Sequence, residues 1–189
     1  MSTKNIMIVG VGGQGTLLAS RILGNAVIQK GYDVKVSEVH GMSQRGGSVV
    51  TYVKFGDVVH SPIIDKGEAD IILAFECLEA YRALPWLKKG GKLIVNHQQI
   101  NPMPVITGAA EYPADILEKL SEIEDLHIVD ALRFAREAGN AKAVNVVLIG
   151  VLAKNTEISY EEWVETIKAT VPPKFLEVNL KAFDIGYNL

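Results

Sequence analysis

A glycine-rich segment near the start of the chain has the composition of an anion-binding loop. It directly follows the apolar run 6–9, and a helical pattern begins at Thr16 and continues to Lys30. The residues that could contact a ligand are Gly10, Gly12, Gly13, Gln14 and Gly15. Glycines let a backbone turn sharply and approach a ligand, and the next helix offers unpaired N–H groups and the positive end of its dipole to a phosphate. The segment therefore predicts an anion cradle.

A second glycine-rich loop, residues 40–47 (HGMSQRGG), follows the expected strand 33–39. We expect it at the same sheet edge as the first loop, where open α/β sheets bind ligands. Its candidate donors to a phosphate or carboxylate are Ser43, Gln44, Arg45, Gly46 and Gly47. In the alternative interpretation the glycines only satisfy turn geometry, and Arg45 is solvated or pairs with a neighbouring subunit.

The first loop also satisfies the G-x-G-x-x-G pattern of nicotinamide and flavin enzymes. Glu38 lies near the position where such enzymes hold the ribose hydroxyls with an acidic residue. Against this, Gln14 stands where many dinucleotide loops carry a small or apolar residue, and no second domain is evident to supply a substrate. A free-standing Rossmann-type NAD(P) or flavin oxidoreductase is the alternative hypothesis. A third is a scaffold whose glycine loop binds nothing.

No group of residues forms a self-sufficient catalytic or metal site in the sequence. The histidines lack metal-ligand spacing, and neither Ser43 nor Ser48 lies in a G-x-S-x-G context. Cys77 is the only cysteine, which excludes an intrachain disulfide, a cysteine-ligated iron–sulfur cluster and a multi-cysteine zinc site. We therefore predict no catalytic and no metal-binding residue in this chain.

The elements that must position these loops follow an α/β rhythm. Apolar runs that predict strands lie at 6–9, 33–39, 71–75, 92–95 and 127–129. Helical patterns between them predict a Rossmann-like, doubly wound and mostly parallel sheet, with a helical C-terminal part. Two β-rich runs, 48–55 and 58–64, flank Gly56-Asp57 and predict an inserted hairpin whose outer strand, with Pro62, is an edge.

Length and composition fit one soluble globular domain over residues 1–189. Hydrophobic residues make up 48% and charged residues 22%, and the net charge is −3. No basic face is evident for nucleic acid, and no apolar stretch approaches the roughly 18 residues of a membrane span. We therefore expect a cytoplasmic protein that binds neither nucleic acid nor membrane.

The two glycine loops together resemble one family. The segments 10–19 (GVGGQGTLLA) and 37–50 (SEVHGMSQRGGSVV) are similar to the gamma-type subunit of 2-oxoacid:ferredoxin oxidoreductases, most specifically to the small (beta) subunit of the indolepyruvate branch. The resemblance continues through 61–64, 67–70, 79–80 and 93–96, so it covers about the first 100 residues by motif and order. The second half matches only in its helical plan.

The resemblance implies a part of a larger enzyme. That enzyme would oxidatively decarboxylate 2-oxoacids, arylpyruvates in this branch, to an acyl-coenzyme A, carbon dioxide and reduced ferredoxin. Thiamine diphosphate and the iron–sulfur clusters would belong to a large partner subunit, and this chain would hold no cofactor alone and would not be active alone. By the same resemblance, the amides of Gly12 to Gly15 and the loop from Ser43 to Gly47 are candidate contacts for coenzyme A phosphates or for the partner subunit.

Overall fold

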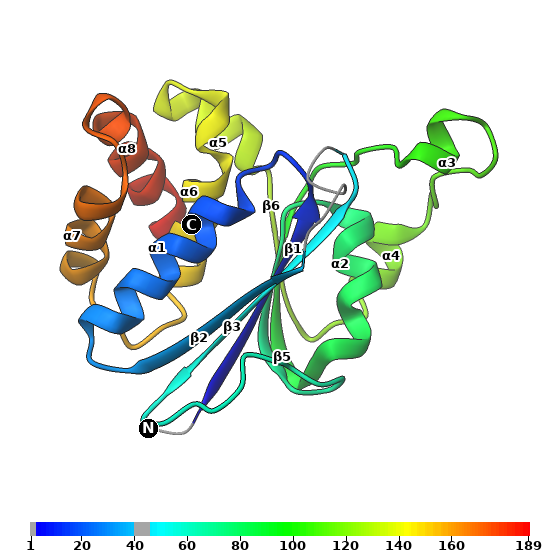
Figure 1. The fold of residues 1–189 in the computed structure, drawn as a ribbon. Coiled ribbons are helices and arrows are strands. Elements are labelled where there is room, and N and C mark those ends of the chain that lie inside the picture. Colours follow the sequence, from blue (N-terminus) through cyan, green and yellow to red (C-terminus); the bar gives the residue numbers. More distant parts are fainter. Residues whose placement is uncertain (1–2, 40–45) are drawn as a thin grey trace.

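A six-stranded sheet forms the centre of the protein, and the computed structural model describes residues 3–39 and 46–189. The strands are β1 (Lys4–Val11), β2 (Asp33–Val39), β3 (Ser48–Gly56), β4 (Ala69–Ala74), β5 (Leu87–Asn96) and β6 (Asp125–Val129). Their order across the sheet is β2-β3-β1-β4-β5-β6 (Figure 1). The β1–β4, β4–β5 and β5–β6 pairs are parallel, whereas β3 runs antiparallel to both of its neighbours. The predicted mostly parallel α/β fold is confirmed.

Helices cover both faces of this sheet, as a doubly wound fold requires (Figure 1). One face carries α1 (Thr16–Gln29), α5 (Ala131–Ala138), α6 (Val144–Ala153), α7 (Tyr160–Thr170) and α8 (Leu176–Tyr187). The other carries α2 (Cys77–Ala83) and α4 (Ile116–Leu120), and the remaining short helices are α3 (Met103–Ile106), η2 (Leu84–Trp86), η3 (Ala141–Ala143) and η4 (Pro173–Phe175). Along β1, Ile6 and Ile8 face the first layer, whereas Met7 and Val9 face the second. Because successive strand residues point to opposite faces, an uninterrupted apolar run suits a strand buried on both sides.

The predicted hairpin of residues 48–55 and 58–64 is not formed, because β3 pairs with β2 and β1 instead. The antiparallel partner of β3 is β2, with Asp33 opposite Gly56 and Val39 opposite Val50, and the other neighbour of β3 is β1. Both edges of β3 are therefore occupied, so residues 58–64 have no free edge on which to pair. They form no strand, and Pro62 does not mark an edge strand. Buried Val59 and Ile64 hold this connection against the body instead.

The C-terminal part is helical, as expected, and α7 begins with a capping box. Every residue of α6 from Asn145 to Ala153 is buried, because the helix lies between the sheet and α8. The backbones of α6 and α8 approach closely at Gly150 and Gly186, where an added Cβ atom would collide with the facing helix. At the start of α7, Ser159 and Glu162 form both bonds of a capping box.

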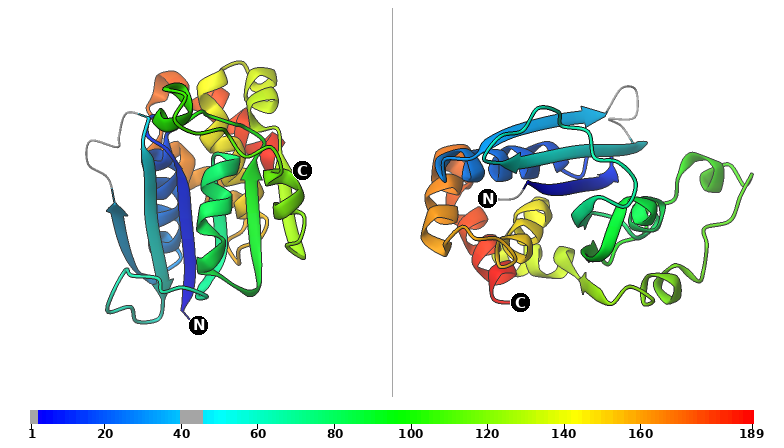
Figure 2. Two further views of the ribbon diagram at one scale, coloured as in Figure 1. Left: turned by 90° about the vertical axis from the view of Figure 1, so that its right-hand side faces the viewer. Right: turned by 90° about the horizontal axis from the view of Figure 1, so that it is seen from below.

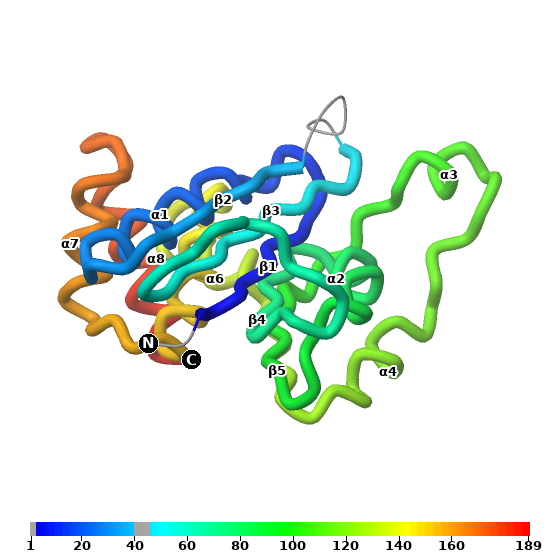
Figure 3. The backbone as a smooth tube through the Cα atoms, turned by 60° about the horizontal axis from the view of Figure 1, so that its bottom comes forward, coloured from blue at the N-terminus to red at the C-terminus, as the bar shows by residue number. Residues whose placement is uncertain are grey.

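The connection from β5 to β6 leaves the body as a projecting arm that carries α3 (Figures 2 and 3). The buried carboxylate of Glu76 holds both ends of the arm. Its Oε1 accepts hydrogen bonds from the Ile100 N–H (3.0 Å) and the Tyr112 hydroxyl (2.5 Å). Burial and the bond to Glu76 raise the pKa of Tyr112 well above its ordinary value, so the phenol stays protonated and donates.

Candidate functional site

The two glycine loops meet at the carboxyl edge of the sheet. The Gly12 N–H donates to the Gly47 carbonyl (2.8 Å), and the Gly46 N–H donates to the Gly12 carbonyl (3.2 Å). Because β3 is antiparallel to both β2 and β1, those two strands run in the same direction and their carboxyl ends share an edge. The expected juxtaposition is therefore confirmed for the part of the second loop that the structure describes. Ser43, Gln44 and Arg45 lie outside the described residues.

The start of α1 leaves its backbone donors open. Its N-cap residue is Gly15, at φ 84°, which has no side chain to accept a hydrogen bond, and no acidic residue lies in the first turn. The N–H groups of Gly13, Gly15, Thr16 and Leu17 donate to no other described residue. Unpaired N–H groups and the positive dipole end of a helix together attract an anion. The first loop therefore has the geometry of an anion cradle.

The Gln14 side chain supports the loop from inside. Its Oε1 accepts from the Val11 N–H (2.7 Å), and its Nε2 donates to the Phe75 carbonyl (2.9 Å) and to Gln98 Oε1 (3.3 Å). These bonds tie the carboxyl end of β1 to the chain that follows β4 and β5. The side-chain amide is thus used within the protein, and the Gln14 backbone N–H also donates internally, to the Val11 carbonyl (3.2 Å).

A group of buried amides extends this support, and no sequence motif indicates it. Asn96 is fully buried and donates to the Phe75 carbonyl (3.1 Å) and to Gln98 Oε1 (3.0 Å), while its Oδ1 accepts from the Ala131 N–H (3.1 Å). Asn145, at the start of α6, donates to the Gly15 carbonyl (3.2 Å). Since asparagines and glutamines are ordinary loop residues, only their proximity in the fold reveals this role.

Two hollows flank the first loop, and their charges differ. The hollow toward β2, of about 290 Å³, is lined by Gly13, Gly15 and Glu38, whose carboxylate accepts from the Ser20 hydroxyl (2.9 Å). The hollow on the other side, of about 490 Å³, is lined by Gly13, Gly15, Gln98 and Lys142. A carboxylate disfavours a phosphate nearby, whereas an ammonium favours it. The second hollow is therefore the better place for a phosphate.

A third hollow of about 250 Å³ lies beside Gly46 and Gly47 and is bordered by the arm. Its charged floor is Glu79, which accepts from the Ser48 hydroxyl (2.5 Å) and pairs with Arg82 Nη1 (2.6 Å). Glu79 itself is buried, so these two partners compensate its charge. The group is satisfied internally and offers no free nucleophile or base.

Cys77 is fully buried at the start of α2, and its Sγ lies 3.7 Å from the Asn96 carbonyl. Burial raises the pKa of its thiol, which keeps it protonated. Across residues 3–39 and 46–189, no cluster of three or more His, Cys, Asp or Glu is arranged to hold a metal ion. Within the same ranges, no helix is long and apolar enough to cross a membrane.

Comparison with protein families gives a match over nearly the whole chain. Residues 5–189 match the model of the pyruvate ferredoxin/flavodoxin oxidoreductase family. Indolepyruvate oxidoreductase subunit IorB of Pyrococcus horikoshii is 47% identical over 98% of this chain and 95% of its own length. The protein of the same name in Archaeoglobus fulgidus is 40% identical over 97% of this chain and 94% of its own length.

Relatives and solved structures from other branches also match. The 2-oxoglutarate synthase subunit KorC of Methanothermobacter thermautotrophicus is 30% identical over 98% of this chain and 94% of its own length. The crystal structure of a keto/oxoacid ferredoxin oxidoreductase gamma subunit from Geobacter sulfurreducens superposes with a TM-score of 0.73 at 25% identity, covering 98% of this chain and 96% of that one. A 2-oxoglutarate:ferredoxin oxidoreductase chain from Magnetococcus marinus has the same fold, with a TM-score of 0.74 at 18% identity. The match spans 100% of this chain and 31% of that longer chain.

Proposed function

The chain belongs to the pyruvate ferredoxin/flavodoxin oxidoreductase family, as a gamma-type subunit of a 2-oxoacid ferredoxin oxidoreductase, and from this premise we propose its role. It serves an enzyme that oxidatively decarboxylates indolepyruvate or related arylpyruvates to acyl-coenzyme A, carbon dioxide and reduced ferredoxin. Its contribution is to receive the phosphates of coenzyme A at the joined glycine loops. The complex works in the cytoplasm, and this chain acts in it as one domain. The preference for arylpyruvates rests on the names of the relatives that are 40–47% identical.

The thiamine and electron-transfer chemistry is assigned to a larger partner subunit. A cluster of the [4Fe–4S] type needs several cysteine thiolates, and this chain has one cysteine, which is buried. Near the glycine loops, the buried carboxylate of Glu79 is already paired with Arg82. We therefore do not expect turnover from the isolated chain.

The observation that carries the phosphate assignment is the uncapped start of α1. The backbone N–H groups of Gly13, Gly15, Thr16 and Leu17 donate to no described residue, and the adjoining hollow is lined by Lys142. Coenzyme A presents phosphates that match backbone donors and a single cation. The carboxylate of Glu38 on the opposite side favours hydroxyl groups over phosphate, which orients the anion toward Lys142.

Purification of the tagged chain from its native host tests the first part of this proposal. We expect a larger thiamine- and iron–sulfur-containing chain to co-purify, and the complex to reduce ferredoxin when given indolepyruvate and coenzyme A. The isolated chain should be inactive in the same assay. Turnover by the isolated chain, or tight binding of NAD(H), NADP(H) or FAD with no response to coenzyme A, would support the alternative of a free-standing dehydrogenase.

A variant pair in the complex tests the phosphate assignment. Gly13 has φ 102° and open space around it, so Gly13→Val places a side chain over the open N–H groups without an internal clash. We expect the KM for coenzyme A to rise at least about tenfold, with the complex still assembled. Gly67 is the matched control, because it also has positive φ and open space but lies far from the loops. Loss of assembly in Gly13→Val, with Gly67→Val still assembled, would assign the loop to subunit docking instead.

A further inference from the structure

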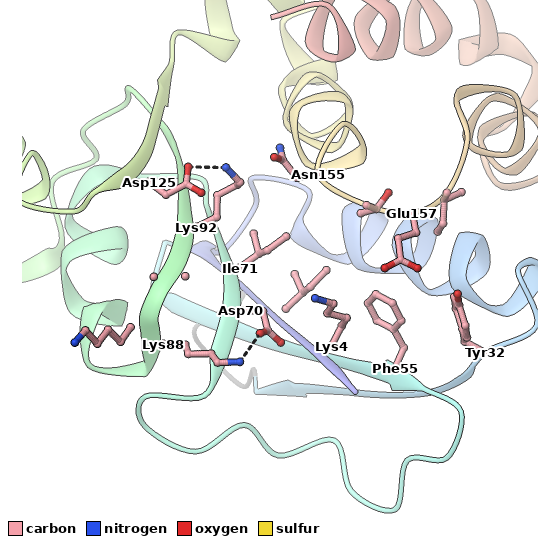
Figure 4. A pocket seen from close by; sticks show the side chains of 16 residues that line it. Lys4, Tyr32, Phe55, Asp70, Ile71, Lys88, Lys92, Asp125, Asn155 and Glu157 are labelled. Atoms are coloured by element: carbon pink, nitrogen blue, oxygen red, sulfur yellow. Dashed lines mark hydrogen bonds and ion pairs between the residues drawn. The ribbon is translucent and has the colours of Figure 1, made fainter. Parts of the chain in front are cut away.

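The opposite, amino edge of the sheet contains a further cavity, of about 330 Å³ (Figure 4). It lies between the first residues of β1, β4 and β5 and the turn that joins α6 to α7. Its apolar surface comes from Ile6, Phe55, Ile71 and Ile158, of which all but Ile71 are nearly fully buried. Binding sites for small molecules start at about 300 Å³, so this volume suits one small ligand.

Most of the charge around the cavity is neutralised within the protein. Lys88 Nζ lies 3.0 Å from Asp70 Oδ1, and Lys92 Nζ lies 2.5 Å from Asp125 Oδ1. Figure 4 shows both pairs at one side of the cavity. These ion pairs form a rim that has no net charge to offer a ligand.

Three charged side chains remain among the described residues, namely the ammonium groups of Lys4 and Lys89 and the carboxylate of Glu157. Lys4 and Glu157 both line the cavity, and Figure 4 shows their charged ends directed into it. Neither makes a hydrogen bond or an ion pair within 4.0 Å to another described residue, although the Glu157 charge also acts at longer range on Lys30. Asn155 uses its Nδ2 to bond the Val151 carbonyl, so its Oδ1 is left to accept. An ammonium, a carboxylate and a free amide oxygen therefore surround an apolar floor.

We propose that this cavity binds an α-amino acid with an apolar side chain, in its zwitterionic form. The ligand carboxylate pairs with Lys4, the ligand ammonium pairs with Glu157 and Asn155 Oδ1, and the side chain lies on Ile6, Ile71 and Phe55. A phosphate would face the Glu157 carboxylate, and a purely apolar molecule would remove water from Lys4 without replacing it. Only a ligand with both charges satisfies both side chains.

Calorimetric titration of the full-length chain with three probes tests this assignment. L-phenylalanine carries both charges, 3-phenylpropionate lacks the ammonium, and phenethylamine lacks the carboxylate. We expect each analogue to bind at least about tenfold more weakly than L-phenylalanine. Equal binding of the three probes, or no binding of L-phenylalanine at millimolar concentration, would overturn the proposal.

Substitutions locate the binding. Lys4→Met should weaken L-phenylalanine binding at least about tenfold, Lys4→Arg should retain most of it, and Lys181→Met on the exposed face of α8 should leave it unchanged. Glu157→Gln should remove the advantage of L-phenylalanine over 3-phenylpropionate. Circular dichroism confirms that each variant is folded. If Lys4→Met binds as well as Lys181→Met, the site is not this cavity. Because the glycine loops lie at the other edge of the sheet, Gly13→Val should not affect this binding, so the two proposals can fail separately.

Discussion

The starts of α1 and α7 present the same physical problem with opposite solutions. Each helix begins with backbone N–H groups that have no partner within the helix. At α7, Ser159 Oγ accepts from the Glu162 N–H, and Glu162 Oε2 accepts from the Ser159 N–H at 2.8 Å. At α1, the N-cap is a glycine, and the first turn has no acidic residue. The protein therefore satisfies one helix start with its own side chains and leaves the other for something else.

The start of α1 lacks the internal stabilisation that side chains provide at the start of α7. A serine or threonine cap stabilises a helix by about 1 kcal/mol, and acidic residues in the first turn add to this. The α1 start forgoes both, yet its loop is held by Gln14, Asn96 and Asn145 from below. Such a loop is rigid and open at the same time, which is what binding of an anion requires.

The largest expected effect comes from removing the support beneath α1. Gln14→Leu removes three hydrogen bonds and leaves the Val11 N–H without its side-chain acceptor, whereas the Phe75 carbonyl keeps its bond from Asn96. Each lost bond costs about 0.5–1.5 kcal/mol, and an unsatisfied buried group costs about 1–3 kcal/mol. We expect the free energy of unfolding to fall by about 2–5 kcal/mol in urea denaturation. Gln99→Leu is the control, since Gln99 is exposed on the neighbouring loop. Equal stability of the two variants would show that the side chain of Gln14 does not hold the loop.

The two glycines of the cradle should differ in the next test. A Cβ at Gly15 would lie 2.8 Å from Asn145 Nδ2, whereas a Cβ at Gly13 meets nothing within 4 Å. Both residues have positive φ, so alanine is strained at either position. We expect Gly15→Ala to lower the free energy of unfolding by about 2–4 kcal/mol and Gly13→Ala by about 1–2 kcal/mol. A reversed order would contradict the contact between Asn145 and the α1 start.

Removing the α7 cap measures how much an internal cap contributes to the free energy of unfolding, which is the reference for the α1 variants. Ser159→Ala removes the acceptor of the Glu162 N–H, and we expect a loss of about 1 kcal/mol in the free energy of unfolding. Ser61→Ala, in the irregular connection after β3, should change it by less than about 0.5 kcal/mol. Anion binding at the glycine loops should be the same in both variants.

Adding an acidic residue to the first turn of α1 should stabilise its N-terminus in the way that acidic residues stabilise that of α7. Leu17 is 48% exposed in the first turn of α1, so its side chain can be replaced without opening the core. Leu17→Glu should be more stable than Leu17→Gln by about 0.3–1 kcal/mol at low salt, because the carboxylate lies near the positive dipole end. In the complex, the same variant should raise the KM for coenzyme A relative to Leu17→Gln. Higher stability with an unchanged KM would separate the dipole from ligand binding.

The smallest expected effect is a pH dependence of stability that arises at the start of α7. The Lys30 ammonium, together with the backbone and hydroxyl of Ser159, lowers the pKa of Glu162 from 4.5 to about 2. Because the pKa is lower in the folded state, the ionised carboxylate stabilises the protein above about pH 4.5, and this contribution is lost as the pH falls toward 2. The stability difference between the wild type and Glu162→Gln should therefore shrink over that range. A difference that stays constant would contradict the role of the charge.

Of the candidate site, the sequence predicts the backbone N–H groups of the first glycine loop. An apolar strand, a glycine loop and a helix in succession predict the cradle at Gly13 and Gly15, because each step depends on neighbouring residues. The prediction of a hairpin over 48–55 and 58–64 was wrong because strand pairing does not depend on neighbouring residues alone. Residues 58–64 have strand-like composition, but pairing depends on which strand edges remain free, and β1 and β2 occupy both edges of β3.

The sequence by itself predicted the six strands, most of the helices and the two glycine loops, and its single cysteine is too few for a cluster. These follow from local periodicity, turn chemistry and composition. The tertiary structure alone decided that Gln14 turns inward to Phe75, 61 residues away, and that Asn145 reaches Gly15 across 130 residues. It also decided that Lys4 and Glu157 border one cavity. Such contacts arise from the packing of whole layers, which no short stretch of sequence encodes.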